Sequence, residues 1–206
     1  MEFGYFFRGL IIGLAIAAPV GPIGVLCVQR TLNYGTLTGF VSGLGAATAD
    51  ACYGIIAAFS VSAIFSFLTD QRIWFSSIGG VYLCYLGVKA FRAVPVESEN
   101  STISPSHARA YLSTFILTLT NPMTILSFAA IFAGFGLSHA NDGYFSAGVL
   151  VCGVFLGSTL WWFCLSSISG LLRGKFKTAH LRWVNRISGI VITGFGFFAI
   201  TAGILR

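Results

Sequence analysis

The stretch APVGPIGVLCVQRTLNYGTLTGFVSGLGAATADACYG, residues 18–54, carries the features that decide the fold. It covers parts of two long apolar runs, places two prolines inside the first run and places one acid in the middle of the second. A long apolar run predicts a transmembrane helix, a proline inside it predicts a break, and a charge at membrane depth predicts a functional site. The segment therefore predicts a membrane protein with an interrupted helix and a buried carboxyl group.

The composition of the whole chain also indicates a membrane location. Of its 206 residues, 56% are hydrophobic and 9% are charged, whereas a soluble domain carries about 25% charged residues. So few polar side chains cannot cover a compact globule of this size, and we expect hydrophobic surface to face lipid. The net charge of +6 does not predict nucleic-acid binding, because the basic residues lie between apolar runs and form no basic face interleaved with aromatic residues.

Six apolar runs are long enough to cross the bilayer, which takes about 20 residues each. They lie near residues 4–29, 37–67, 74–92, 110–137, 144–172 and 184–205. Residues 93–108 form the one long polar connection, and their Pro, Ser and Asn content predicts a loop. We therefore expect an all-α integral membrane protein with six transmembrane helices. It divides into residues 1–92, a cytoplasmic loop at residues 93–109, and residues 110–206.

The basic residues predict the orientation of the chain, because Lys and Arg collect on the cytoplasmic side of a membrane. They concentrate after the first, third and fifth apolar runs, at Arg30, Lys89, Arg92, Arg109, Arg173, Lys175, Lys177, Arg182 and Arg186. These three connections lie on one side of a six-span chain. We therefore expect a multi-pass protein of the inner or plasma membrane with both termini outside.

Helix breakers recur at matching places in the two halves of the chain. The first apolar run contains Pro19-Val20-Gly21-Pro22 and the fourth contains Thr120-Asn121-Pro122. The third and sixth runs each hold two glycines seven residues apart, Gly80 with Gly87 and Gly189 with Gly196. These matches predict two three-helix repeats, which an odd number of spans orients oppositely in the membrane. Secondary transporters often have such inverted repeats, with the binding site between discontinuous helices.

Asp50 is the only acid deep within an apolar run. A helix beginning near Thr36 would carry it about 21 Å into the membrane at 1.5 Å per residue, where a charge is costly unless it faces a cavity, is protonated or has a partner. We favour a role in proton coupling or in binding a substrate ammonium group. The alternative is a structural hydrogen bond to a hydroxyl group of a neighbouring helix. Tyr53 lies one turn further on and shares the same face.

The two proline segments are the other candidate site elements. Proline leaves backbone carbonyl groups unpaired, and such backbone is tolerated at membrane depth where protein or cavity water covers it. A simple kink is the alternative, but two breakers at matching positions favour a cavity lining. The predicted substrate-binding or proton-binding residues are thus Pro19, Gly21, Pro22, Asp50, Tyr53, Thr120, Asn121 and Pro122. We expect no catalytic residue, metal or cofactor.

Other functions remain alternatives. A membrane thiol-relay protein with a similar duplicated plan would need a reactive cysteine in each half, whereas the five cysteines lie within apolar runs and form no C-x-x-C pair. An exporter of a metal or inorganic ion would bring several acids, histidines or cysteines together in the spans. A structural membrane protein without transport is the third alternative.

Two tryptophans, Trp161 and Trp162, lie inside the fifth run. They either line a cavity or pack against other helices.

Three segments together resemble the lysine exporter (LysE-type, RhtB-like) family of amino-acid exporters. They are residues 18–54, residues 79–92 (GGVYLCYLGVKAFR) and residues 120–136 (TNPMTILSFAAIFAGFG). The resemblance implies six helices in two inverted halves, proton-driven export of amino acids or related small metabolites from the cytoplasm, and often a homodimer. The protein would then be a secondary transporter working by proton antiport, and not an enzyme.

The family motifs fall on particular residues of this chain. The Pro-Gly-Pro region of the first helix corresponds to Pro19, Gly21 and Pro22, with Val20 inserted, and the Asn-Pro pair of the fourth helix corresponds to Asn121 and Pro122. Members that export basic amino acids commonly carry a second aspartate after the Asn-Pro pair. Residues 123–128 (MTILSF) contain none, so the resemblance favours neutral substrates.

Overall fold

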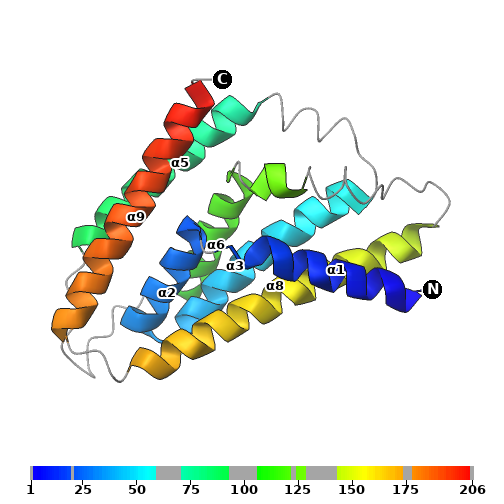
Figure 1. Cartoon of the computed structure of the whole chain (residues 1–206), viewed down its shortest axis with the longest axis horizontal. Helices are drawn as coiled ribbons and strands as arrows, with labels where there is room; N and C mark the ends of the chain where they lie inside the picture. Colours follow the sequence, from blue (N-terminus) through cyan, green and yellow to red (C-terminus); the bar gives the residue numbers. More distant parts are fainter. Residues whose placement is uncertain are drawn as a thin grey trace.

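The described part of the protein consists of helices with short irregular connections and contains no strand, as the sequence predicts. The computed structural model describes residues 2–19, 21–58, 71–92, 106–121, 124–128, 143–173 and 178–204. The principal helices are α1 (Glu2–Ala17), α2 (Pro22–Tyr34), α3 (Thr36–Ala58), α5 (Arg72–Arg92), α6 (His107–Leu119), α8 (Gly143–Arg173) and α9 (Thr178–Ile204) (Figure 1). Residues 124–128 form a further short helical segment.

Three of these helices are long and apolar enough to cross a membrane, namely Thr36–Ile56, Phe145–Arg173 and Leu181–Thr201. The pair α1 and α2 counts as a fourth span if its two halves, which meet at an angle of 80°, cross as one. The prediction of six spans stays a prediction: α5, the third expected span, is not among these helices, and residues 129–137 of the expected fourth run lie outside the described part of the chain.

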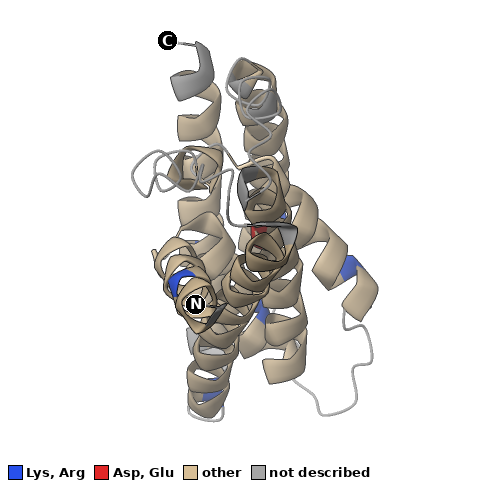
Figure 2. Ribbon diagram, turned by 90° about the vertical axis from the view of Figure 1, so that its right-hand side faces the viewer, with Lys and Arg blue, Asp and Glu red and all other residues tan. Residues whose placement is uncertain are grey.

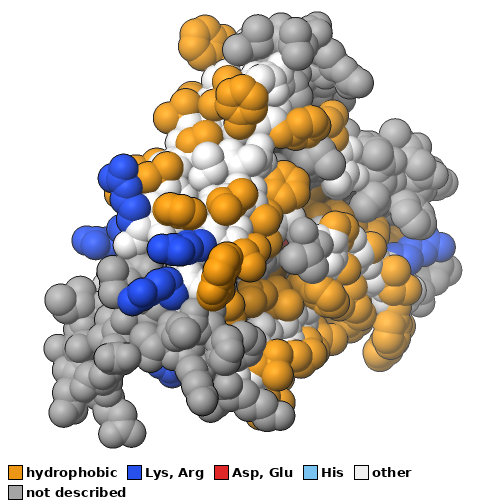
Figure 3. All heavy atoms as spheres, turned by 60° about the vertical axis from the view of Figure 1, so that its left-hand side comes forward, with side chains coloured by type: hydrophobic (Ala, Val, Ile, Leu, Met, Phe, Trp, Pro, Cys, Tyr) orange, Lys and Arg blue, Asp and Glu red, His pale blue; other side chains and the backbone are white. Residues whose placement is uncertain are grey.

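Apolar side chains cover much of the outer surface. Phe197 on α9 and Leu171 on α8 are 67% and 79% exposed, and Figure 3 shows hydrophobic side chains spread over one face, with Lys and Arg in a group at the left of the view and a smaller group at its right edge. Charged residues are sparse throughout the helices (Figure 2). Burying such a surface in lipid removes apolar area from water, which is the dominant favourable term in such transfers. The distribution therefore fits a protein surrounded by a bilayer.

The helices form a bundle with a separate pair at its side. In the bundle, α3 packs against α6 and α8, and α1 packs against α8. The side pair consists of α5 and α9, which run antiparallel along each other, and α2 connects it to the bundle by contacting α9 as well as α3 and α8 (Figure 1). A cavity lined by residues of α2, α5 and α6 lies between this pair and the bundle.

Glycines let α5 and α9 approach closely. A Cβ atom on Gly80 would lie 2.7 Å from the carbonyl oxygen of Gly196, and one on Gly87 would lie 2.8 Å from that of Gly189. Midway between these contacts, Cys84 Sγ lies 3.8 Å from the carbonyl oxygen of Thr193. The first glycine of each helix thus faces the second glycine of the other.

Both predicted helix interruptions are present. The first lies between Ala17, where α1 ends, and Pro22, where α2 begins with Gly21 as its N-cap. At the second, α6 ends at Leu119, and the carbonyl oxygen of Asn121 accepts hydrogen bonds from the first backbone N–H groups of the segment 124–128.

One predicted boundary is wrong. The loop expected at residues 93–109 ends earlier, because α6 begins at His107, and Ser106 caps it by accepting a hydrogen bond from the backbone N–H of Arg109. A serine at this position satisfies one of the N–H groups that a helix start leaves unpaired. Residues 107–109 are therefore helical.

Candidate functional site

Asp50 is buried where α3 crosses α8. Its side chain is 3% exposed, and its Oδ2 accepts a hydrogen bond of 2.7 Å from the hydroxyl group of Ser158. The indole Nε1 of Trp162, one turn along α8, donates to the same hydroxyl oxygen at 3.1 Å. No cationic side chain of the described residues contacts Asp50. The carboxyl group therefore has a neutral hydroxyl partner, which leaves both the structural and the functional interpretation of Asp50 open.

A small cavity lies against Asp50 and brings the two helix interruptions together. Its volume is about 60 Å³. Its lining includes Pro19, Gly21 and Pro22 from the first interruption and Asn121 from the second, together with Ile16, Ala17, Ile23, Gly24, Ala46, Asp50, Thr118, Thr124 and Trp162. We call this space the central cavity. Ligand pockets usually measure about 300–1,000 Å³, so the central cavity in this conformation has room for water but not for an amino acid.

The backbone around the central cavity suits a polar ligand. The first turn of a helix has N–H groups without partners in its own helix, and α2 begins at the cavity wall with Pro22, Ile23 and Gly24. Gly21 has no side chain to cover them, and a Cβ atom at this position would meet nothing within 4 Å. The start of α2 therefore presents backbone donors next to a buried carboxyl group.

Tyr53 and Thr120 do not line the central cavity. Tyr53 is 1% exposed, and its hydroxyl group donates a hydrogen bond of 2.5 Å to the carbonyl oxygen of Leu119, the last residue of α6. Thr120 donates to Ile116 in its own helix and lies against Gly79 of α5. Tyr53 thus binds the end of α6 at the second interruption without lining the cavity. Pro122, the remaining predicted site residue, lies outside the described residues.

Sequence reasoning missed Ser158, the hydrogen-bond partner of Asp50. A serine in an apolar helix carries no signal of its own, since it packs well in membrane interiors. The one available signal was position, because Ser158 follows Asp50 by 108 residues, close to the spacing between the matched glycines. The structure also settles the position of Trp162, which is 4% exposed and lines the central cavity.

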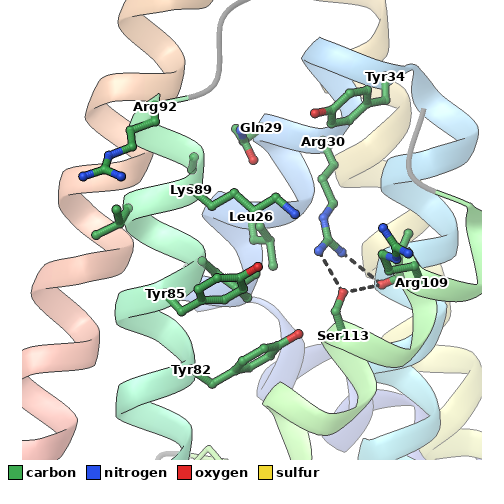
Figure 4. Close-up of a pocket in the computed structure, with 14 residues that line it drawn as sticks. Leu26, Gln29, Arg30, Tyr34, Tyr82, Tyr85, Lys89, Arg92, Arg109 and Ser113 are labelled. Carbon is green, nitrogen blue, oxygen red and sulfur yellow. Dashed lines mark hydrogen bonds between the residues drawn. The ribbon is translucent and has the colours of Figure 1, made fainter. Parts of the chain in front are cut away.

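A second and larger cavity opens between α2, α5 and α6. Its volume is about 810 Å³. The lining includes Arg30 and Gln29 from α2, the tyrosines Tyr82 and Tyr85 with Lys89 and Arg92 from α5, and Arg109 and Ser113 from α6 (Figure 4). We call this space the basic cavity. The sequence assigned its cationic residues to membrane topology alone and did not place them around a common space.

Arg30 is the buried cation of the basic cavity. Its side chain is 9% exposed, and its guanidinium group donates to the hydroxyl of Ser42 at 2.9 Å, the carbonyl of Ala110 at 2.9 Å and the hydroxyl of Ser113 at 2.8 Å. All three acceptors are neutral. Arg30 therefore ties α2 to α3 and α6 and keeps its positive charge without an acidic partner in the described residues.

Metal ligation and disulfide formation have no support in the described ranges. No group of three or more His, Cys, Asp or Glu residues there is placed to hold a metal ion. The five cysteines are free, and only Cys27 is fully buried.

The helices, the apolar surface and the buried polar groups define an α-helical membrane protein with interrupted helices around a central carboxyl group. The chain belongs to the LysE type translocator family, whose model matches residues 14–203. The resemblance drawn from the sequence is thereby confirmed.

Its relatives include amino-acid efflux proteins. It is 28% identical over 199 residues to the putative amino acid efflux protein YcgF of Bacillus subtilis, covering 94% of this chain and 93% of that protein. It is 25% identical over 146 residues to the threonine efflux protein of Escherichia coli, covering 65% and 68%. The uncharacterized membrane protein YrhP of Bacillus subtilis is 28% identical over 186 residues, covering 84% and 87%. No solved structure matches the chain.

Proposed function

We propose that this translocator exports neutral amino acids or related small metabolites from the cytoplasm by proton antiport, with the central cavity as its binding site. The observation that carries the proposal is that Asp50 and both helix interruptions border one cavity. Discontinuous helices facing an ionisable group at membrane depth are typical of secondary transporters. The efflux proteins among the relatives support export as the direction.

We also propose that the chain is a six-span inverted repeat. Two-fold related segments bring equivalent residues into contact at the axis, so within the second and third helices of each repeat these residues should differ by a nearly constant number of positions, whereas the matched prolines Pro22 and Pro122 of the first helices differ by 100. Cys84 and Thr193 contact each other across α5 and α9 and are 109 positions apart. Asp50 and Ser158 contact each other across α3 and α8 and are 108 positions apart. Two separate helix pairs thus support the same two-fold relation between the halves of the chain. The offset differs by one residue between the pairs, which corresponds to a one-residue difference in the lengths of the loops between the helices.

In the proposed cycle, the backbone N–H groups at the start of α2 bind the substrate carboxylate, as helix N-termini bind anions. Asp50 either binds the substrate ammonium or carries a proton. During export Asp50 is ionised, and the Ser158 hydroxyl stabilises it by a charge-assisted hydrogen bond. After release outside, Asp50 takes up a proton, which it gives up at the cytoplasmic side when the empty carrier returns. The substrate and the proton thus move in opposite directions.

The preference for neutral substrates rests on charge. A basic amino acid would bring a second positive group into the central cavity, whereas Asp50 is the only acidic residue among the described residues that line it. An unpaired charge in such a place is costly.

We also propose an orientation and an oligomeric state. The end of the protein that carries Arg30, Lys89, Arg109 and Arg173 lies in the cytoplasm, and both termini lie outside the plasma membrane. The protein forms a homodimer.

The test uses the purified protein in proteoliposomes loaded with radiolabelled L-threonine, L-alanine or L-leucine. An inward proton gradient should accelerate efflux of at least one of them through the wild type. Asp50→Asn should remove this acceleration, because an amide neither ionises nor carries a proton. Ser166→Ala is the matched control, since Ser166 is buried on α8 and its hydroxyl has no hydrogen-bond partner. An Asp50→Asn protein with wild-type efflux and wild-type dependence on the gradient would refute the proposal.

A further inference from the structure

The basic cavity gathers positive charge that no acidic side chain of the described residues balances. Arg30, Lys89 and Arg109 reach it from three different helices. Asp50 is the only acidic residue whose side chain the structure describes, and it borders the central cavity instead. A concave space lined by one sign of charge attracts small ions of the opposite sign and raises their local concentration. The basic cavity is therefore built to receive an anion.

Arg30 provides the specific binding group. A guanidinium group has five N–H donors, and three of them bond to the oxygens of Ser42, Ala110 and Ser113. The Nε–H and the second Nη2–H have no acceptor within the described part of the chain. These two donors form one edge of the guanidinium plane, and such an edge binds a carboxylate through two parallel hydrogen bonds. The three existing bonds hold this edge in place.

The remaining lining fits a small organic anion. Figure 4 shows the Lys89 ammonium extending toward Arg30, and the hydroxyl groups of Tyr82 and Tyr85 pointing into the same space from α5. The volume of about 810 Å³ falls within the range of about 300–1,000 Å³ for ligand sites. The aromatic rings and Leu26 add apolar surface for a side chain. An amino acid thus finds a partner for its carboxylate and room for its side chain.

We propose that the basic cavity is a second, cytoplasmic docking site, in which Arg30 binds the carboxylate of the substrate and Lys89 and Arg109 attract it. The substrate class is consequently carboxylate-bearing small metabolites, and amines without a carboxylate are rejected before they reach Asp50. This inference rests on the proposed export function, because it assigns the cavity to the substrate of that transport. The central and basic cavities then act in sequence along one path.

Binding to the purified protein in phosphatidylcholine nanodiscs tests the inference directly. L-Threonine, L-alanine and L-leucine are titrated calorimetrically and compared with their carboxamides, which keep the ammonium and the side chain but lack the carboxylate. At least one acid should bind, and its amide should bind about tenfold more weakly or worse, as expected when a charge-assisted pair is lost. Arg30→Lys keeps the positive charge but lacks the two parallel N–H donors of the guanidinium group. The ratio of the affinity for the acid to that for its amide should therefore fall.

A charge-matched pair of variants separates the cavity from a general effect of charge. Lys89→Gln with Arg109→Gln should weaken binding of the acid about three- to tenfold, since each exposed charge contributes modestly, and should leave the amide unchanged. Arg182→Gln with Arg186→Gln removes the same charge from exposed positions on α9 that do not line the cavity. This control should bind the acid like the wild type.

Several outcomes would overturn the inference. They are an absence of binding by all three acids, equal binding of acid and amide, and equal effects of the two double variants. Displacement of the amino acid by phosphatidylglycerol in the nanodiscs would assign the cavity to a lipid headgroup and overturn it as well. Efflux measured in parallel separates this inference from the proposed function. Carboxylate binding without efflux refutes only the function, whereas efflux of acid and amide at equal rates refutes only the docking site.

Discussion

The close contact between α5 and α9 predicts how a single added methyl group changes the stability of the protein. At Gly196 a Cβ atom would lie 2.7 Å from the carbonyl oxygen of Gly80 and 2.8 Å from the backbone nitrogen of Cys84. Backbone atoms cannot turn aside, so the two helices must separate in Gly196→Ala. Gly194 lies two residues earlier on the same helix, and a Cβ atom there would meet nothing within 4 Å. Gly194→Ala is therefore a control with the same chemical change.

The difference between these variants isolates the packing cost. Replacing Gly by Ala in a helix gains about 0.5–1 kcal/mol in either variant, and this gain cancels in the comparison. Overpacking a close contact costs about 1–3 kcal/mol. Gly196→Ala should therefore be less stable than Gly194→Ala by about 1–3 kcal/mol in unfolding by sodium dodecyl sulfate, followed by circular dichroism in mixed micelles. Equal stability of the two variants would show that the helices do not approach as closely as described.

Two further predictions concern hydrogen bonds near the central cavity. Tyr53→Phe removes the donor to the Leu119 carbonyl and should cost about 0.5–1.5 kcal/mol in the same unfolding assay; a wild-type unfolding curve would contradict this role. Ser158→Ala removes the hydroxyl that donates to Asp50, and gradient-driven efflux should fall about tenfold or more, since a hydrogen bond to a charged group contributes about 1.5–3 kcal/mol. Ser166→Ala serves again as control, and an equal rate in the two serine variants would exclude a special role for Ser158.

Much of the candidate site was predictable because its signals are local. Hydropathy marks the helices, and proline and glycine mark the interruptions wherever the chain folds. An acid within an apolar run stands out for the same reason. Pro19, Gly21, Pro22, Asp50 and Asn121 were all selected in this way, and the structure brings them to one cavity.

Other assignments depended on neighbours that are distant in sequence. Tyr53 shares a helix with Asp50, but its hydroxyl turns to the carbonyl of Leu119, 66 positions away. Arg30 has the sequence context of a topology signal, yet it bonds to the oxygens of Ala110 and Ser113, 80 and 83 positions away. These hydrogen-bond partners could not be predicted from the sequence. The hydropathy pattern of an apolar helix does not show which neighbouring helix a polar side chain faces.

The sequence by itself determined that this chain is a helical membrane protein with two broken segments, a buried acid and an export-family pattern. These properties follow from the solvation of each segment and from the backbone chemistry of proline, which act residue by residue. Only the tertiary structure decided that Asp50 meets Ser158 and that Arg30, Lys89 and Arg109 surround one cavity. Such groupings arise from the way glycine-lined helices pack against one another, and the packing is set by contacts between residues far apart in the chain.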